Sequence, residues 1–123
     1  MIFLIDDDDI QNLINTRVIS IVNSDVHVRA FTSAEEALKT LATTSDEPPQ
    51  LIFLDINMPK MNGWDFLDDY QNNKYPTKVY MLSSSINEKD IKKSETYDSV
   101  HGFICKPLVV EKLAEILKKE NLS

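Results

Sequence analysis

Five polar side chains in this sequence each follow a short apolar run. They are three carboxylates, a hydroxyl and an ammonium group: Asp6, Asp7, Asp55, Ser83 and Lys106. If the apolar runs are parallel strands, residues that end them converge at one edge of the sheet. Clustered carboxylates repel one another and have raised pKa values unless a cation is present. Oxygen ligands without His or Cys suit Mg²⁺ or Mn²⁺ better than zinc.

This set of side chains is suited to phosphoryl transfer. A carboxylate can attack phosphorus while a divalent metal and a lysine neutralise charge on the equatorial oxygens. Taken alone, an aspartate at a strand end is often only a helix cap, so Asp55 by itself has an equally good structural interpretation. The functional interpretation depends on the joint pattern of all five residues.

The elements that must position these residues alternate along the chain. Apolar runs predict five buried strands, over 2–5, 27–31, 51–54, 78–82 and 102–105. Helical spacing predicts five helices, from the aspartate run to Val22 and over 34–41, 64–70, 88–97 and 109–119. Five repeats of strand then helix favour an α/β fold with a parallel sheet covered by helices on both faces.

Two of these helices carry apolar residues at spacings of three and four. In the first helix they form one predicted apolar face: Ile10, Leu13, Ile14, Val18, Ile21 and Val22. In the last helix they form the predicted core stripe: Val109, Leu113, Ile116 and Leu117. Asp8 and Asp9 are interpreted as first-turn residues that favour the helix dipole, and not as ligands.

Length and charge limit the classes of function. The 123 residues suit a single domain, over 1–123. Acidic residues outnumber basic ones by 20 to 13, and the net charge of −7 disfavours direct binding to nucleic acid. The lone Cys105 cannot form an internal disulfide, and no signal peptide is evident, so we expect a reducing cytoplasm. The longest apolar run, Met1 to Ile5, is far below the roughly 20 residues of a membrane span.

Four strings together resemble the response-regulator receiver family of two-component signalling. They are Ile5-Asp6-Asp7-Asp8, the loop from Leu54-Asp55 to Asn62-Gly63, Met81-Leu82-Ser83-Ser84 and Cys105-Lys106-Pro107. The resemblance implies a flavodoxin-like, doubly wound sheet of five parallel strands in the order 2-1-3-4-5, with five helices. It also implies a phosphoacceptor signalling switch that catalyses only its own phosphorylation and dephosphorylation, and not an enzyme with a separate substrate.

The resemblance assigns roles to the acidic residues and their neighbour. Asp55 is the expected phosphoacceptor and also a metal ligand. Asp7 is expected to bind Mg²⁺ (or Mn²⁺) directly, and Asp6 largely through water. The backbone carbonyl of Asn57 is the remaining expected protein ligand.

The resemblance also implies a switch. Ser83 is expected to bond a phosphoryl oxygen and move inward, and Lys106 to pair with Asp55 and then with its phosphoryl group. Phe103, which lacks the hydroxyl of the tyrosine in many family members, is expected to rotate into the vacated space. Pro107 is expected to follow a cis peptide bond. The fourth helix, fifth strand and fifth helix would form the readout surface.

The partners implied are proteins. A histidine kinase or a histidine phosphotransfer protein would supply the phosphoryl group, and an unidentified downstream protein would receive the signal. A phosphorylation-dependent homodimer is left open, and neither direct nucleic-acid binding nor membrane insertion is expected. Met1 directly before the first strand, and a polar end at 121–123, favour a complete protein over a piece of a hybrid kinase.

Three other interpretations compete with this one. A haloacid-dehalogenase-type enzyme would share the aspartyl-phosphate but needs an acidic pair after Lys106, where the sequence has only Glu111, Glu115 and Glu120 on the last predicted helix. A flavin-binding electron carrier would need a glycine-rich phosphate loop, and the chain has two glycines. A degenerate receiver that only binds partners would have lost an aspartate or the lysine, and both are present.

Overall fold

The computed structural model describes residues 1–43, 48–73, 77–85 and 87–122, in which strands and helices alternate. The strands are β1 (Ile2–Ile5), β2 (Val28–Phe31), β3 (Leu51–Asp55), β4 (Lys78–Ser83) and β5 (Val100–Cys105). The helices are α1 (Asp9–Val22), α2 (Ala34–Thr43), α3 (Gly63–Asn73), α4 (Glu88–Ser94) and α5 (Val110–Lys119). The strands pair in parallel in the order β2-β1-β3-β4-β5, which confirms the predicted flavodoxin-like topology.

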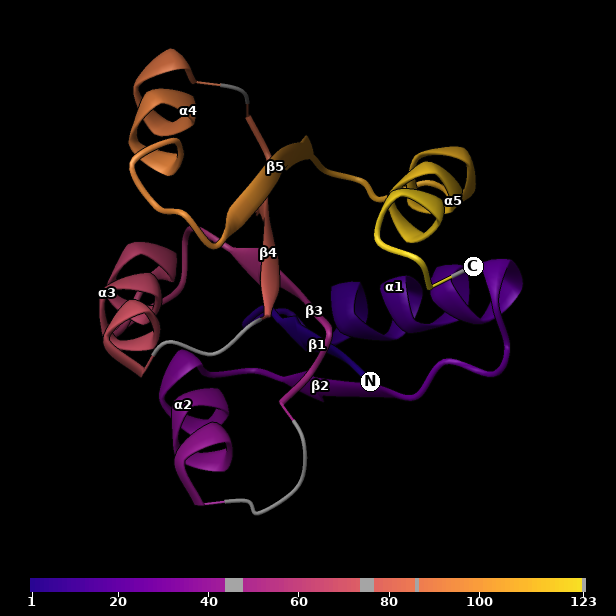
Figure 1. The fold of residues 1–123 in the computed structure, drawn as a ribbon, viewed down its shortest axis with the longest axis horizontal. Helices are drawn as coiled ribbons and strands as arrows, with labels where there is room; N and C mark the ends of the chain where they lie inside the picture. The colour runs from indigo at the N-terminus through magenta and orange to yellow at the C-terminus, as the bar shows by residue number, and fades with distance from the viewer. Residues whose placement is uncertain (44–47, 74–76, 86, 123) are drawn as a thin grey trace.

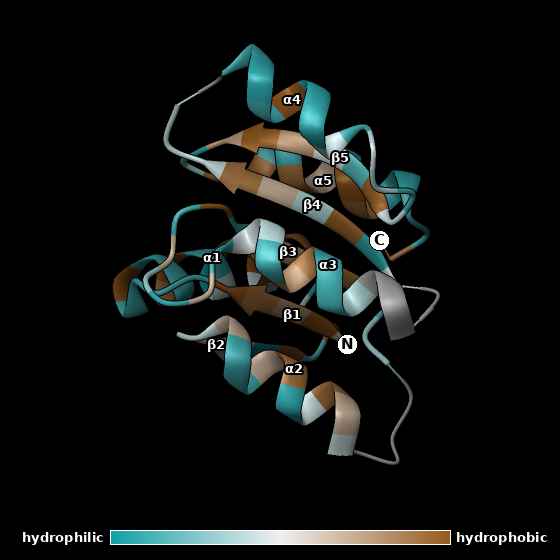
Figure 2. Ribbon diagram, turned by 90° about the vertical axis from the view of Figure 1, so that its left-hand side faces the viewer, coloured by the Kyte–Doolittle hydropathy of each residue, from teal (hydrophilic) through white to brown (hydrophobic). Residues whose placement is uncertain are grey.

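The helices cover both faces of this sheet. In Figure 1, α1 and α5 lie on one side, and α2, α3 and α4 lie on the other. Because side chains alternate across a strand, Phe3 and Ile5 of β1 enter the core under α2 and α3, whereas Ile2 and Leu4 enter the core under α1 and α5. All residues of β1 and β3 are buried, as expected for the middle of a parallel sheet, and β1 is hydrophobic along its length in Figure 2.

Most predicted elements differ from those of the structure by one to three residues at an end, and two of these differences have a local explanation. The helix predicted over 88–97 ends at Ser94, where the hydroxyls of Ser94 and Thr96 donate to carbonyl oxygens of the last turn and so satisfy groups that a longer helix would use. The fifth strand begins at Val100 and not at Gly102, because Val100 already pairs with Val79 of β4, and an irregularity in the pairing leaves the next residue, His101, without a partner residue in β4. The strand is therefore longer at the end that is remote from Lys106.

The predicted apolar face of α1 is in large part not buried. Ile10, Leu13 and Ile21 are 67%, 57% and 70% exposed, and the residues that the helix buries are Asn12, Asn15 and Ile19. Asn12 ties the buried side of the helix to the sheet, since its Nδ2 donates to the backbone oxygens of Asp6 (3.0 Å) and Phe31 (3.2 Å). Val18 and Val22 contact the core only in part. The stripe is therefore one face of the helix, as predicted, but most of it is turned away from the core.

Within the described residues, none of the helices combines the length and the apolar character that crossing a bilayer requires.

Candidate functional site

The ends of the strands are tied together by main-chain hydrogen bonds that continue past the sheet. The amide of Asp6 donates to the Phe31 oxygen (3.0 Å), and the amide of Lys106 donates to the Ser83 oxygen (2.7 Å). The residue after Asp55, Ile56, donates to Leu82 at 3.2 Å. These bonds fix the backbone from which each candidate side chain projects, so the residues predicted to converge are held at one rim of the sheet.

Three carboxylates gather at this rim. Asp6, Asp7 and Asp55 each offer an oxygen atom, and these atoms lie within 4.8 Å of one another. Asp6 and Asp55 are only 1% and 4% exposed, whereas Asp7 is open to solvent. The site is therefore a buried pair of carboxylates with a third at its mouth.

Lys106 bridges the buried pair. Its Nζ lies 2.8 Å from Asp6 Oδ2 and 3.4 Å from Asp55 Oδ1. Burial acts to lower the pKa of Lys106, but the hydrogen bond to Asp6 and the charge of Asp55 outweigh it, so that the pKa is raised and the ammonium stays charged. The Lys106–Pro107 peptide bond is cis, as the resemblance to the receiver family implies.

The raised pKa of Asp55 shows that Lys106 alone does not neutralise the negative charge of the carboxylates at this site. Burial, and then the negative charge of Asp6, raise the pKa of Asp55 from 3.8 to about 6, although Lys106 and the amide of Asn57 act in the opposite direction. The amide of Asn57 donates to Asp55 Oδ1 at 3.3 Å. A second cation would relieve the remaining repulsion, and an all-oxygen donor set suits a hard divalent ion. The residues present therefore fit Mg²⁺.

The two candidate switch residues, Ser83 and Phe103, contact residues outside the carboxylate cluster in this structure. Ser83 is buried, and its hydroxyl donates to the Ser85 oxygen (2.7 Å) while it accepts from the Ser85 amide (3.3 Å). Phe103 is half-buried against the core under α2 and α3, opposite Met81 of β4. The metal-binding role of the Asn57 carbonyl and the switch roles of Ser83 and Phe103 stay predictions.

Two supporting residues were not singled out for their roles from the sequence. Asp8 is the N-cap of α1, and its own amide donates to Asp6 Oδ1 at 2.9 Å, which orients the Asp6 carboxylate. Gly63 begins α3 so close to β3 that an added Cβ would lie 2.7 Å from the Asp55 backbone oxygen. The sequence held a signal for Asp8, which is a residue type that caps helices and stands two positions after the strand-end Asp6. The close approach of Gly63 to β3 is visible only in the three-dimensional structure.

Comparison with known proteins agrees with this geometry. The model of the response regulator receiver domain matches residues 2–118. The chain belongs to the response regulator receiver family. Phosphorylation on an aspartate, dependence on Mg²⁺ and phosphorylation by histidine kinases are general properties of these receiver domains.

Individual relatives of this receiver domain support the same assignment. The transcriptional regulatory protein DcuR of Escherichia coli K12 is 31% identical over 116 residues, which are 94% of this chain and 48% of that protein. The receiver chain thus spans about half the length of the curated relatives it matches. A two-component response regulator from Cytophaga hutchinsonii is 32% identical with a TM-score of 0.87, covering 99% of this chain and 96% of that one. One from Legionella pneumophila is 27% identical with a TM-score of 0.86, covering 99% and 98%.

Proposed function

We propose that this receiver domain is a cytoplasmic phosphorylation switch that carries a phosphoryl group on Asp55. The observation that carries the proposal is the bridge formed by Lys106 between the buried carboxylates of Asp6 and Asp55, beside the more exposed Asp7. This set holds a nucleophile, a fixed cation and a place for a second cation at one rim. The chain would act on its own side chain and not on a separate substrate.

The residues divide the work of phosphoryl transfer. An Asp55 carboxylate oxygen forms the new bond to phosphorus while the bond to the donor nitrogen of a phosphohistidine breaks. Lys106, already 3.4 Å from Asp55, neutralises charge on the phosphoryl oxygens. Because Asp6 holds the same ammonium at 2.8 Å, Lys106 stays oriented when Asp55 changes its chemical form.

The acidic residues would also hold the metal ion. Asp6, Asp7, Asp55 and the carbonyl of Asn57 are the proposed ligands. When bound, Mg²⁺ would neutralise charge on the transferring group and on the carboxylates. Asp8 keeps Asp6 aimed at the site through its amide (2.9 Å).

The switch would begin at Ser83. Its hydroxyl donates to Ser85 at 2.7 Å, so it must give up this bond in order to donate to a phosphoryl oxygen. Its movement would vacate space toward which the half-buried Phe103 can rotate. Since Ser83 pairs with Cys105 of β5, the change would reach the surface formed by α4, β5 and α5, where a downstream protein or a second phosphorylated copy would bind.

The exposed apolar side of α1 favours a protein donor. Ile10 (67% exposed), Leu13 (57%) and Ile14 (43%) lie on the first turns of the helix that starts directly after Asp6 and Asp7. Apolar side chains exposed together on one helix mark a protein contact. A histidine kinase or histidine phosphotransfer protein that packs there would present its phosphohistidine to the rim.

Intact-protein mass spectrometry tests the chemical step. We expect wild-type protein in acetyl phosphate and Mg²⁺ to gain one phosphoryl group, and to gain none with EDTA or after Asp55→Asn. Asp9→Asn is a matched control, since it removes a neighbouring carboxylate that belongs to the helix start. A folded wild type that binds Mg²⁺ but is phosphorylated neither by acetyl phosphate nor by a phosphotransfer protein would refute the proposal.

A second comparison tests the docking of the donor. The double variant Ile10→Ser and Ile14→Ser should be phosphorylated by acetyl phosphate at the wild-type rate but slowly by phosphotransfer proteins. Ile21→Ser, on the far end of the same helix, should keep both rates. Equal loss with both kinds of donor would mean that the α1 substitutions disturb the site and not the docking.

A further inference from the structure

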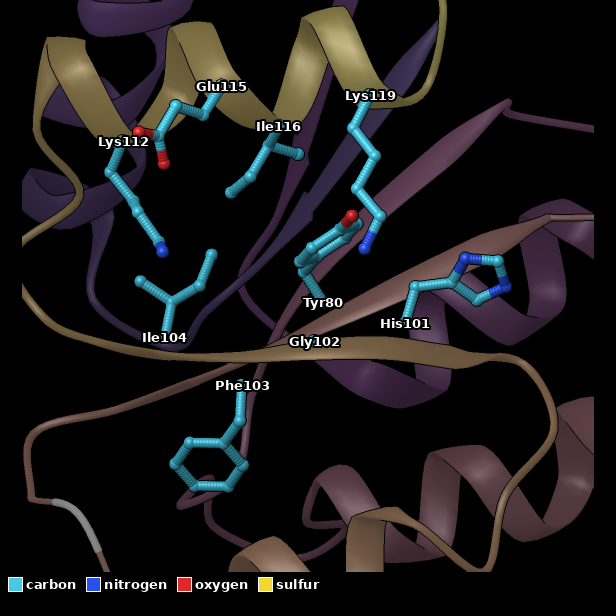
Figure 3. Close-up of a pocket in the computed structure, with 9 residues that line it drawn as sticks. All are labelled: Tyr80, His101, Gly102, Phe103, Ile104, Lys112, Glu115, Ile116 and Lys119. Atoms are coloured by element: carbon cyan, nitrogen blue, oxygen red, sulfur yellow. The ribbon is translucent and has the colours of Figure 1, made fainter.

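A pocket of about 190 Å³ lies between β5 and α5, away from the phosphoacceptor rim (Figure 3). Its floor is made by Tyr80, Ile104 and Ile116, which are 3%, 4% and 4% exposed. The floor depends on Gly102, because a Cβ at that position would lie 2.6 Å from Cε2 of Tyr80. Any larger residue there would have to displace the Tyr80 ring.

The polar groups at one end of the pocket are satisfied within the protein. Tyr80 donates its hydroxyl hydrogen to Glu120 at 2.6 Å, and Glu120 also lies 3.0 Å from Lys78 Nζ and 3.5 Å from His101 Nδ1. The Glu120 side chain is only 4% exposed. This network holds the end of α5 against β4 and β5, so the pocket has a fixed wall there.

Two lysines at the pocket are not used in this way. Lys112 and Lys119 extend from α5 toward β5 on either side of Ile116 (Figure 3), and neither forms an ion pair with another residue that the structure describes. Glu115 is the only acidic residue among the described residues that line the pocket. The pocket therefore presents two available cations around an apolar floor.

The charge of the whole chain makes this pocket distinctive. Residues 1–77 contain 5 basic and 13 acidic residues, a balance of −8, whereas residues 78–123 contain 8 basic and 7 acidic residues, a balance of +1. By this balance, an acidic partner should meet less repulsion at the part of the chain that contains β5 and α5.

The position of the pocket favours an extended occupant. Within the described residues β5 is an edge strand that pairs with β4 alone, so its outer main-chain groups are open to another strand. Side chains of such a strand alternate, so every second one would face the α5 side of the sheet. An apolar side chain could then reach the floor, and acidic side chains two positions before and after it, on the same face of the strand, could reach Lys112 and Lys119.

We infer that this pocket binds an extended, acidic and apolar segment of a partner protein, which adds along β5 and places carboxylates on Lys112 and Lys119. The inference rests on the proposed function in that it specifies the partner chemistry of the output surface. Phe103, the proposed switch residue, is among the residues that line the pocket, but its ring points away from the side chains of α5 (Figure 3), so its rotation would be felt through the same strand.

Peptide titration followed by ¹⁵N NMR tests the inference on the intact chain. The probes are short peptides in which a Leu or Phe has an Asp or Glu two positions before it and two positions after it, so that all three share one face of the strand, and matched peptides in which Asn or Gln replaces every acid. We expect the acidic peptides to shift amide resonances of β5 and α5, and to bind more weakly as salt is raised. Lys112→Gln combined with Lys119→Gln should weaken binding about tenfold or more.

Lys118→Gln is the matched control, since it removes the same charge from the same helix at a position that does not line the pocket. It should leave the affinity nearly unchanged. Equal binding of the neutral peptides, equal weakening by Lys118→Gln, or shifts confined to other elements would each overturn the inference.

Phosphorylation of the same samples by acetyl phosphate keeps the two proposals apart. The peptides are titrated first into unphosphorylated protein, where binding does not need Asp55 to react. If the pocket binds acidic peptides in a protein that binds Mg²⁺ but is phosphorylated neither by acetyl phosphate nor by a phosphotransfer protein, the pocket inference is supported and the proposed switch is refuted. A protein that is phosphorylated but does not bind the peptides in either state would overturn the pocket inference alone.

Discussion

Replacing Asp55 by asparagine should stabilise the metal-free protein at neutral pH. Burial and the charge of Asp6 raise the pKa of Asp55 to about 6, so its ionised form is disfavoured in the folded chain relative to the unfolded one. Asparagine has the same shape, carries no charge, and can still accept from the Asn57 amide. Lys106 keeps its bond to Asp6 at 2.8 Å.

The pKa shift of Asp55 gives the size and the sign of the expected stability difference between the variant and the wild type. Between 3.8 and about 6 it corresponds to roughly 3 kcal/mol at most, and we expect a gain of about 1–3 kcal/mol at pH 7.5. Because the folded-state pKa is raised, the stability that protonated Asp55 contributes is complete below pH 3.8 and is lost as the pH rises through 6. The advantage of the Asp55→Asn variant should therefore open between about pH 4 and pH 6 and then level off.

Urea unfolding of both proteins in EDTA, at pH 4.5 and at pH 7.5, measures this difference. Groups other than Asp55 titrate in both proteins, so their contributions to the difference in unfolding free energy largely cancel. Added Mg²⁺ should reverse the order, because it binds the wild-type carboxylates more tightly and stabilises that folded state by mass action. An Asp55→Asn variant that is less stable than wild type in EDTA at pH 7.5, or a difference that does not depend on pH, would show that the electrostatic reasoning about this site is wrong.

Three further substitutions test supporting contacts. Gly63→Ala should cost about 1–3 kcal/mol in urea unfolding and weaken Mg²⁺ binding, since the new Cβ would lie 2.7 Å from the Asp55 oxygen; an unchanged stability would contradict this. Asn12→Ala should cost about 1–3 kcal/mol, because the Asp6 carbonyl loses its side-chain donor and the Phe31 carbonyl keeps only the Asp6 amide, whereas Gln11→Ala should cost little. Glu120→Gln should cost about 1 kcal/mol in thermal unfolding at pH 7. Burial acts to raise the pKa of Glu120, but the Tyr80 hydrogen bond and the basic neighbours outweigh burial and lower that pKa. The cost of Glu120→Gln should therefore fade as the pH falls through the lowered pKa.

The order of elements and the membership of the site could be predicted from the sequence. The strands β1 and β3 are continuous apolar runs because the middle of a parallel sheet is buried on both faces. Asp6, Asp55 and Lys106 could be grouped because parallel strands bring their carboxyl ends to one rim, and the structure places carboxylate oxygens of the two aspartates 2.8 and 3.4 Å from Lys106 Nζ.

Tertiary structure alone decided which side of α1 is buried and how the site is charged. Periodicity shows that residues share a face, but the Asn12 hydrogen bonds to two strand ends turn that face outward. The raised pKa of Asp55 likewise depends on burial and on the distance to Asp6, neither of which sequence spacing contains. The sequence by itself thus determined which residues lie at the rim. Burial, helix rotation and the pocket beside β5 come from contacts between segments far apart in the chain.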